Sequence, residues 1–167
     1  MDANEGLAFL AAHQPLPDDH DLTQVVIDQY DEVRRYFIAH PDPRCVPLFL
    51  GSFGDGVGWG VYQLVDEVMR AHPGDVVVRG LDSALASPHL SVRSWALQIA
   101  MDYADRRLVP HFKRSLFSDD HEERYWAAQN LAINFAPEDA PVLRLALSRE
   151  TEPSVLEVLR SVPCPPL

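Results

Sequence analysis

The stretch Arg93-Ser94-Trp95-Ala96-Leu97-Gln98 returns 31 residues later as Arg124-Tyr125-Trp126-Ala127-Ala128-Gln129. Each copy follows a Leu-x-Ser segment, Leu85-Ala86-Ser87 in the first case and Leu116-Phe117-Ser118 in the second. Two matching segments at one spacing are seldom produced by chance, so the chain contains an internal repeat. A period in this range is typical of stacked helical repeats.

Prolines extend the repeat in both directions. Pro47, Pro110 and Pro141 lie 63 and then 31 residues apart. Val78 occupies the equivalent repeat position between the first two prolines. Proline is favoured in the first turn of a helix because its missing N–H has no helical partner there. The repeat therefore predicts four helix pairs between residues 41 and 162.

The spacing of apolar residues and the positions of prolines set the expected helix boundaries. The segment Asp75-Val76-Val77-Val78 is rich in β-branched residues, as strands are, but its place in the repeat predicts a helix. We expect an all-α fold, in which Asp21 caps the second helix. The expected helices are 2–12 and 22–39, followed by the pairs 43–53 with 57–71, 75–86 with 89–104, 108–117 with 120–135, and 138–149 with 153–162.

The early proline, the Leu-x-Ser/Asp turn and the arginine followed by small apolar residues resemble the HEAT-repeat family over residues 41–162. The resemblance implies a short α-solenoid, a right-handed superhelix whose second helices line a concave surface that holds a protein or nucleic-acid partner. Gly60-Val61 and Val155-Leu156 occupy the arginine slots of the first and last units, which are expected to cap the stack. The expected organisation is one α-solenoid domain, 1–167, with N-terminal capping helices at 1–40, repeats at 41–162 and a tail at 163–167.

The charge of the chain is strongly negative. Twenty-five acidic residues against fourteen basic ones give a formal charge of −11, and residues 1–80 hold 13 acids and 5 bases. Nucleic acid is bound through surplus positive charge, so this balance argues against a nucleic-acid groove and suits a basic protein partner. The alternative is that the acidity only keeps a small domain soluble.

Cys45 and Cys164 are too few for a disulfide framework, and we expect reduced thiols in a cytoplasmic protein, although a bridge between them stays open. The first residues, Met1-Asp2-Ala3-Asn4-Glu5, are acidic and hold no apolar run of signal-peptide length, and no stretch approaches the roughly 20 apolar residues of a membrane span, so we expect no membrane partner.

The three tryptophans fall on the expected second helices, where each shares a side with polar residues. Aromatic residues are typical anchors of protein interfaces, so we expect this strip to bind a partner. The alternative is that the tryptophans seal the joints between repeats. The expected partner-binding residues are Trp59, Gln63, Asp66 and Glu67 on the first such helix, Trp95, Gln98 and Asp102 on the second, and Trp126, Gln129 and Asn130 on the third.

Other motifs point to no catalytic or cofactor chemistry. Gly54-x-Gly56-x-Gly58 follows no strand and precedes no Gly-Lys-Ser/Thr, so it does not predict a nucleotide site. The histidines form no metal-ligand pair, and Asp18-Asp19-His20-Asp21 is interpreted as a solvated helix cap. Cys45 has no evident histidine partner. Arg93 and Arg124 are expected to be scaffold residues, and we expect no metal and no cofactor.

Short acidic HEAT proteins are similar to the immunity proteins that bacteria make against contact-dependent growth inhibition toxins and other polymorphic toxins, many of them basic nucleases. We therefore expect a non-enzymatic antitoxin that binds one basic toxin domain. One alternative is a HEAT-like DNA glycosylase, with Trp95, Trp126 and Asp102 in its groove, but the charge opposes DNA binding. Another is a scaffold or chaperone-like subunit related to bilin lyases.

Overall fold

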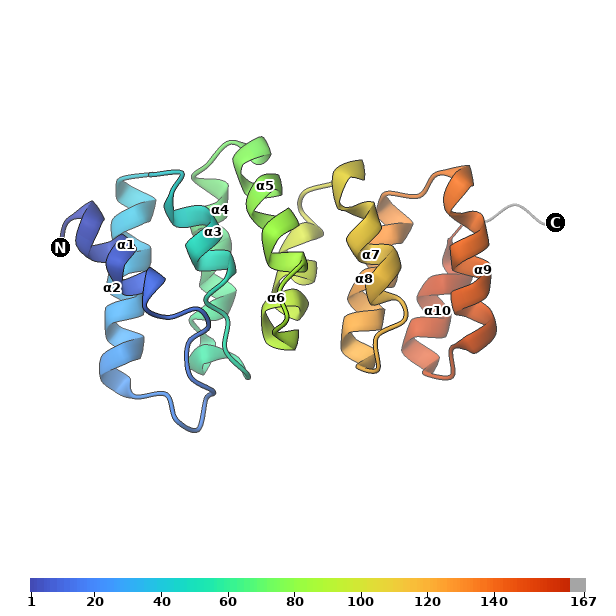
Figure 1. Ribbon diagram of the computed structural model, residues 1–167, viewed down its shortest axis with the longest axis horizontal. Coiled ribbons are helices and arrows are strands. Elements are labelled where there is room, and N and C mark those ends of the chain that lie inside the picture. The colour runs from blue at the N-terminus through green and yellow to red at the C-terminus, as the bar shows by residue number, and fades with distance from the viewer. Residues whose placement is uncertain (163–167) are drawn as a thin grey trace. The chain divides into compact units, whose positions relative to one another are not determined.

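A computed structural model describes residues 1–162, and all regular structure in that range is helical (Figure 1). The expectation of an all-α fold is confirmed. The α-helices are α1 (Ala3–Ala11), α2 (Gln24–Ala39), α3 (Cys45–Leu50), α4 (Val65–Arg70), α5 (Gly74–Leu85), α6 (Leu90–Ala100), α7 (Val109–Ser115), α8 (His121–Ile133), α9 (Ala140–Arg149) and α10 (Pro153–Ser161). Short 3-10 turns are η1 (Gly58–Gly60), η2 (Tyr62–Leu64), η3 (Arg106–Leu108) and η4 (Pro137–Asp139).

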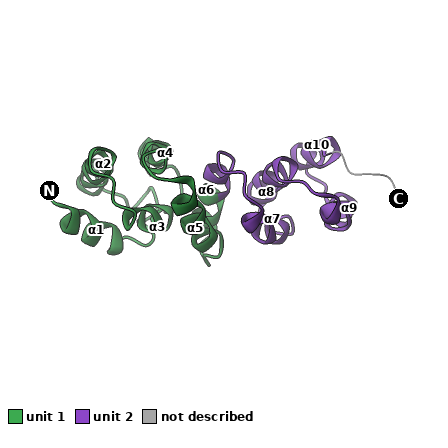
Figure 2. Cartoon of the chain, turned by 90° about the horizontal axis from the view of Figure 1, so that it is seen from above, with its two compact units in different colours: residues 1–96 green, residues 97–167 purple. Residues whose placement is uncertain are grey.

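The chain divides into two compact units, residues 1–96 (unit 1) and 97–167 (unit 2), with the boundary inside α6 (Figure 2). The expected tail at 163–167 lies outside the described residues. The possible pairing of Cys45 with Cys164 lies outside them as well.

Unit 1 consists of two layers of helices. Helix α3 packs against α1 and α5 in one layer, while α2 packs against α4 in the other. Aromatic rings fill the space between the layers: Tyr30 and Phe37 of α2 both meet Phe49 edge to face, at centroid distances of 5.6 and 6.2 Å. The buried Tyr30 hydroxyl lies 2.8 Å from Ser52 Oγ, so its polar end is satisfied inside this core.

Helix α2 forms where the apolar spacing predicts it, and Ile27, Tyr30, Val33 and Phe37 are its buried stripe. Its N-cap is Thr23, whose hydroxyl accepts a hydrogen bond from the Val26 amide, instead of the expected Asp21.

The expected helix 57–71 is wrong over its first half. That segment forms η1 and η2 before α4 begins at Val65. Gly58 has a φ of +56°, and a Cβ atom there would lie 2.5 Å from the Tyr62 ring. Because only glycine accepts both the left-handed backbone and this close contact, a loop replaces the first turns of the helix.

In unit 2, α8 packs against α7 and α10, and α9 packs against α10. Ala127, Ala128 and Leu131 of α8 are fully buried, as the expected apolar face requires. A buried carboxylate lies at the start of α9: Asp139, with no exposed surface, meets Arg106 Nη1 at 2.5 Å and Lys113 Nζ at 2.5 Å. Burial opposes ionisation of Asp139, but hydrogen bonds from Arg106, Lys113 and the Ala136 amide lower its pKa to about 2.

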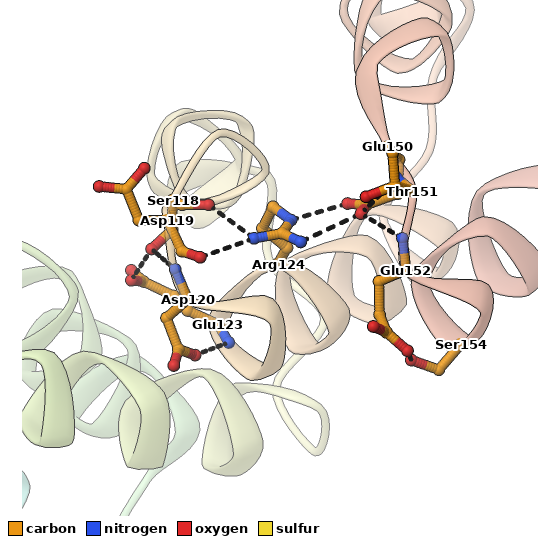
Figure 3. Close-up of polar contacts among 9 residues, drawn as sticks. All are labelled: Ser118, Asp119, Asp120, Glu123, Arg124, Glu150, Thr151, Glu152 and Ser154. Carbon is orange, nitrogen blue, oxygen red and sulfur yellow. Dashed lines mark hydrogen bonds and ion pairs between the residues drawn. The ribbon is translucent and has the colours of Figure 1, made fainter.

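The repeated arginines form the same bonds in the two units. Arg93 Nη1 donates to the carbonyls of Ser87 and Pro88 at 3.0 and 3.1 Å. Arg124 Nη1 donates to the carbonyls of Ser118 and Asp119 at 2.9 and 3.0 Å (Figure 3). Each arginine thus satisfies carbonyls in the turn that precedes its own helix, and the expectation that both are scaffold residues is confirmed.

Candidate partner-binding surfaces

The most exposed tryptophan lies on a loop of unit 1. Trp59 in η1 is 50% exposed and has a φ of +49°, a left-handed conformation that is unusual for a bulky residue. Its indole N–H donates to the Asp19 carbonyl at 3.2 Å. The Asp19 carboxylate in turn accepts hydrogen bonds from the amides of Val57 and Gly58 at 3.0 and 2.8 Å. Residues 18–21 and 55–59 are therefore tied together, and we call them the loop surface.

A close backbone contact lies directly before the two segments of the loop surface, between residues 16 and 54. A Cβ atom at Gly54 would lie 2.4 Å from the Leu16 carbonyl oxygen. The two backbone segments can therefore come this close only because glycine has no side chain. The Gly54 amide donates to the Tyr62 hydroxyl at 3.0 Å. Burial raises the pKa of Tyr62 to about 12, and the nearby carboxylates of Asp19 and Asp18 act in the same direction. The tyrosine is thus a neutral, fixed support for the loop.

Trp95 of α6 supports this loop from the inside. Its ring stacks on Phe53 at 5.5 Å and meets Tyr62 edge to face at 5.7 Å. Its indole N–H donates to the Gly56 carbonyl at 3.2 Å. Trp95 is half-buried, and these contacts match the alternative in which a tryptophan seals a joint between repeats.

The loop surface carries carboxylates that no basic side chain of the described residues neutralises. Every base among residues 1–80 is ion-paired: Arg34 and Arg35 with Asp31, Arg34 also with Glu67, Arg44 with Asp42, Arg70 with Asp66, and Arg79 with Asp75. Within the described part of the chain, Asp18, Asp19 and Asp55 have no such basic partner. Three unpaired carboxylates therefore belong to the loop surface, which also carries Trp59.

This arrangement differs from the expected strip. Asp66 and Glu67 are engaged with Arg70 and Arg34, at 3.1 and 2.5 Å. Gln63 lies exposed in η2. The carboxylates of the loop surface come instead from Asp18, Asp19 and Asp55, and of these only Asp18 and Asp19 belong to the segment 18–21 that was interpreted as a solvated helix cap. The density of acidic residues before α2 could have indicated this surface from the sequence. Their contact with residue 59 could not be predicted, because some forty residues of chain separate the two segments.

A second surface lies in unit 2. A groove of about 490 Å³ is lined by Gln98 of α6, by His121, Glu122, Tyr125 and Trp126 of α8, and by Ser154 of α10. We call it the Trp126 groove. Its size falls in the range of ordinary ligand pockets, roughly 300 to 1,000 Å³. Glu122, Tyr125 and Trp126 share one side of α8 because they are three and four residues apart.

The polar groups of the Trp126 groove are only partly used within the protein. Gln129 Nε2 donates to the Tyr125 hydroxyl at 2.9 Å, which holds the Tyr125 side chain. The rings of Tyr125 and Trp126 lie edge to face at 5.2 Å. Unlike the indoles of Trp59 and Trp95, that of Trp126 donates to no group within residues 1–162.

Two of the residues expected on this strip lie elsewhere. Asn130 has no exposed surface. Its Nδ2 donates to the carbonyls of Leu97 and Trp126 at 2.8 and 2.9 Å, so Asn130 joins α6 to α8 inside unit 2. Asp102 is exposed, but it lies in the turn after α6 ends at Ala100. Asn130 is therefore a core residue, and Asp102 is not on the helix that was expected to present it.

Sequence reasoning missed a histidine beside Cys45. His72 Nε2 lies 3.9 Å from Cys45 Sγ, and His72 Nδ1 lies 2.8 Å from the Val68 carbonyl oxygen. The thiol is fully buried, and burial together with Asp42 raises its pKa to about 12. A nucleophilic cysteine requires a depressed pKa and access to substrate, so this pair is part of the core.

Within residues 1–162, no group of three or more histidine, cysteine or acidic side chains is arranged to hold a metal ion. No helix of that range has the length and apolar character needed to cross a membrane. The fold defines an all-α protein. Comparison with known proteins adds no relative, since no protein-family model, no curated protein and no solved structure matches the chain.

Proposed function

We propose that this chain is a non-catalytic, HEAT-like α-solenoid protein that binds a basic protein partner through the loop surface of unit 1. The observation that carries the proposal is Trp59, a half-exposed indole that donates to Asp19 and shares the loop surface with the unpaired carboxylates of Asp18 and Asp55. A rigid aromatic anchor loses little conformational entropy on binding, and unpaired carboxylates attract and orient a basic surface.

The partner that best suits this chemistry is a basic bacterial toxin domain, such as a contact-dependent growth inhibition nuclease, with this chain as its antitoxin. The net charge of −11 and the 31-residue repeat support that choice. The runner-up, a HEAT-like DNA glycosylase, would need Trp95 in its DNA groove. The ring and the indole N–H of Trp95 are already engaged within unit 1.

The test is stopped-flow association with a basic toxin domain, taken from the gene immediately upstream if that gene encodes a large toxin, over a series of salt concentrations. Association should be fast at low salt and slow as salt rises, while dissociation changes much less. The double variant Asp18→Asn with Asp55→Asn should slow association at low salt, as added salt does. Asp28→Asn with Glu32→Gln removes the same charge from the exposed side of α2 and should leave the rate nearly unchanged.

Three results would contradict the proposal. One is equal slowing by both double variants. A second is growth inhibition by the toxin candidate that co-expression of this chain does not relieve. The third is tight binding to a DNA duplex or excision of a base, which would favour the glycosylase.

A further inference from the structure

Trp126, whose indole N–H donates to no group within residues 1–162, lines a groove that combines aromatic rings with a carboxylate. We propose that the Trp126 groove binds the guanidinium group of an arginine presented by a protein partner. This inference rests on the proposed function, because it names the side chain that the partner would place on unit 2. It concerns a different surface from the loop surface and is tested without the partner.

The charge of the groove favours a cation. Glu122 is the only acidic residue in the lining, and it forms no ion pair within residues 1–162. Arg124, two residues further along α8, does not neutralise Glu122. Its guanidinium is bound to Glu150 at 2.7 Å and to the carbonyls of Ser118 and Asp119 (Figure 3). A cation entering the groove would therefore meet an uncompensated carboxylate.

The aromatic rings favour arginine over lysine. A guanidinium is planar, so it can lie on an indole or phenol face while its N–H groups reach a carboxylate in a fork. Trp126 and Tyr125 supply two ring faces at an interplanar angle of 79°, and Glu122 is one turn away on the same side of α8. Lysine would gain the charge contact without the stacking.

The remaining polar groups of the groove suit a peptide backbone. The Trp126 indole can donate to a carbonyl of the bound segment, since no group within residues 1–162 accepts from it. Ser154 lines the groove, and its hydroxyl is 3.5 Å from a carboxylate oxygen of Glu152, which does not line it (Figure 3). A second carboxylate is thus close to the Ser154 side of the groove. The groove fits an arginine within a basic segment better than it fits a neutral or acidic group.

The experiment titrates the full ¹⁵N-labelled chain with N-acetyl-arginine-N-methylamide and follows the three indole N–H signals by NMR. Trp59→Phe and Trp126→Phe variants assign the signals. We expect a saturable shift of the Trp126 signal. The Trp59 and Trp95 signals should not move, because their indoles are bonded to Asp19 and Gly56 inside unit 1. The blocked citrulline amide, which has the same shape without the charge, should cause no shift.

Glu122→Gln should weaken arginine binding about tenfold, the usual size of one hydrogen bond to a charged group. Glu157→Gln makes the same charge change on α10, outside the groove, and should leave binding unchanged. The proposal is overturned if the Trp126 signal stays still at roughly 10 mM ligand, tenfold above a millimolar Kd. It is also overturned if citrulline shifts the signal equally, or if Glu122→Gln has no effect.

These outcomes are separate from those of the proposed function. If arginine shifts the Trp126 signal but the chain does not relieve growth inhibition by the toxin, the antitoxin function is rejected and arginine binding in the Trp126 groove is retained. If the chain relieves growth inhibition but arginine does not shift the Trp126 signal, arginine binding in the groove is rejected and the proposed function of the loop surface is retained.

Discussion

Arg124 Nε lies 2.7 Å from a carboxylate oxygen of Glu150, and this ion pair ties α8 to the turn between α9 and α10 (Figure 3). The other Glu150 oxygen accepts hydrogen bonds from the amides of Thr151 and Glu152 at 2.9 and 2.8 Å. Both side chains are largely buried, at 17% exposure for Arg124 and 4% for Glu150. The pair therefore fixes the start of α10.

Arg124→Ala should lower the free energy of unfolding by about 3 kcal/mol, because it leaves the Glu150 carboxylate and two turn carbonyls without their donor. Urea denaturation measures the change. Arg79→Ala breaks an exposed pair with Asp75 on α5 and should change stability by less than about 1 kcal/mol. Equal effects of the two variants would show that the Arg124 pair contributes no more than a surface contact.

Acid should destabilise the protein partly through Glu150. Hydrogen bonds from Arg124 and from the amides of Glu152 and Thr151 outweigh burial and lower its pKa from 4.5 to about 2. The unfolded chain therefore binds more protons than the folded chain between these two values. The contribution of Glu150 is fully present above about pH 5 and is lost as the pH falls toward 2. Asp139, with its pKa also near 2, should add a parallel loss.

The measurement is the free energy of unfolding from urea curves at several pH values between 6 and 3. Glu150→Gln should be less stable at pH 6 but lose less stability on acidification. Glu157→Gln on α10 should follow the unchanged protein. If Glu150→Gln gives the same slope as the unchanged protein, this carboxylate does not titrate as we expect.

Trp59 and Trp95 should respond oppositely to truncation. Trp59→Ala should leave the melting temperature nearly unchanged and weaken binding of the basic partner by about thirtyfold, the effect of a 2 kcal/mol anchor. Trp95→Ala should lower stability by about 3 kcal/mol, because it removes the ring between Phe53 and Tyr62 and the donor to Gly56. Thermal melts and partner titrations on both variants check this. Large destabilisation by Trp59→Ala would place Trp59 in the core.

Cys45 should be unreactive in the folded protein. Its buried thiol, with a pKa near 12, provides almost no thiolate at pH 8. Iodoacetamide should modify the peptide containing Cys45 only after urea is added, as mass spectrometry of the digested protein would show. Rapid modification without urea would mean that α3 opens to solvent.

The repeat predicted most of the helices within two residues of their ends. Helix α5 was expected at 75–86 and occupies Gly74–Leu85, although its valines resemble a strand. The spacing of apolar residues predicts these helices because each helix buries its apolar side against helices that are close to it in the sequence. It failed at residues 57–64, where the fit of Gly58 against Tyr62 decides the backbone.

The sites were harder to predict because they depend on contacts distant in sequence. A helical projection places Trp95 on a polar side, but it contains no information about Phe53, which covers that side. The same projection treats Asn130 as solvent-facing, whereas its amide bridges to Leu97 on a neighbouring helix. Pairings such as Asp19 with Gly58, or Cys45 with His72, require the folded chain.

The contact of Gly54 with the Leu16 carbonyl also constrains how this sequence can evolve. Any side chain at residue 54 would collide with backbone, which cannot rotate away as a side chain can. A substitution there would have to be accompanied by a change of path in the segment before α2. Residues 16–19 and 54–58 should therefore be inherited together, and grafting one segment into another protein without its counterpart should fail to reproduce the loop.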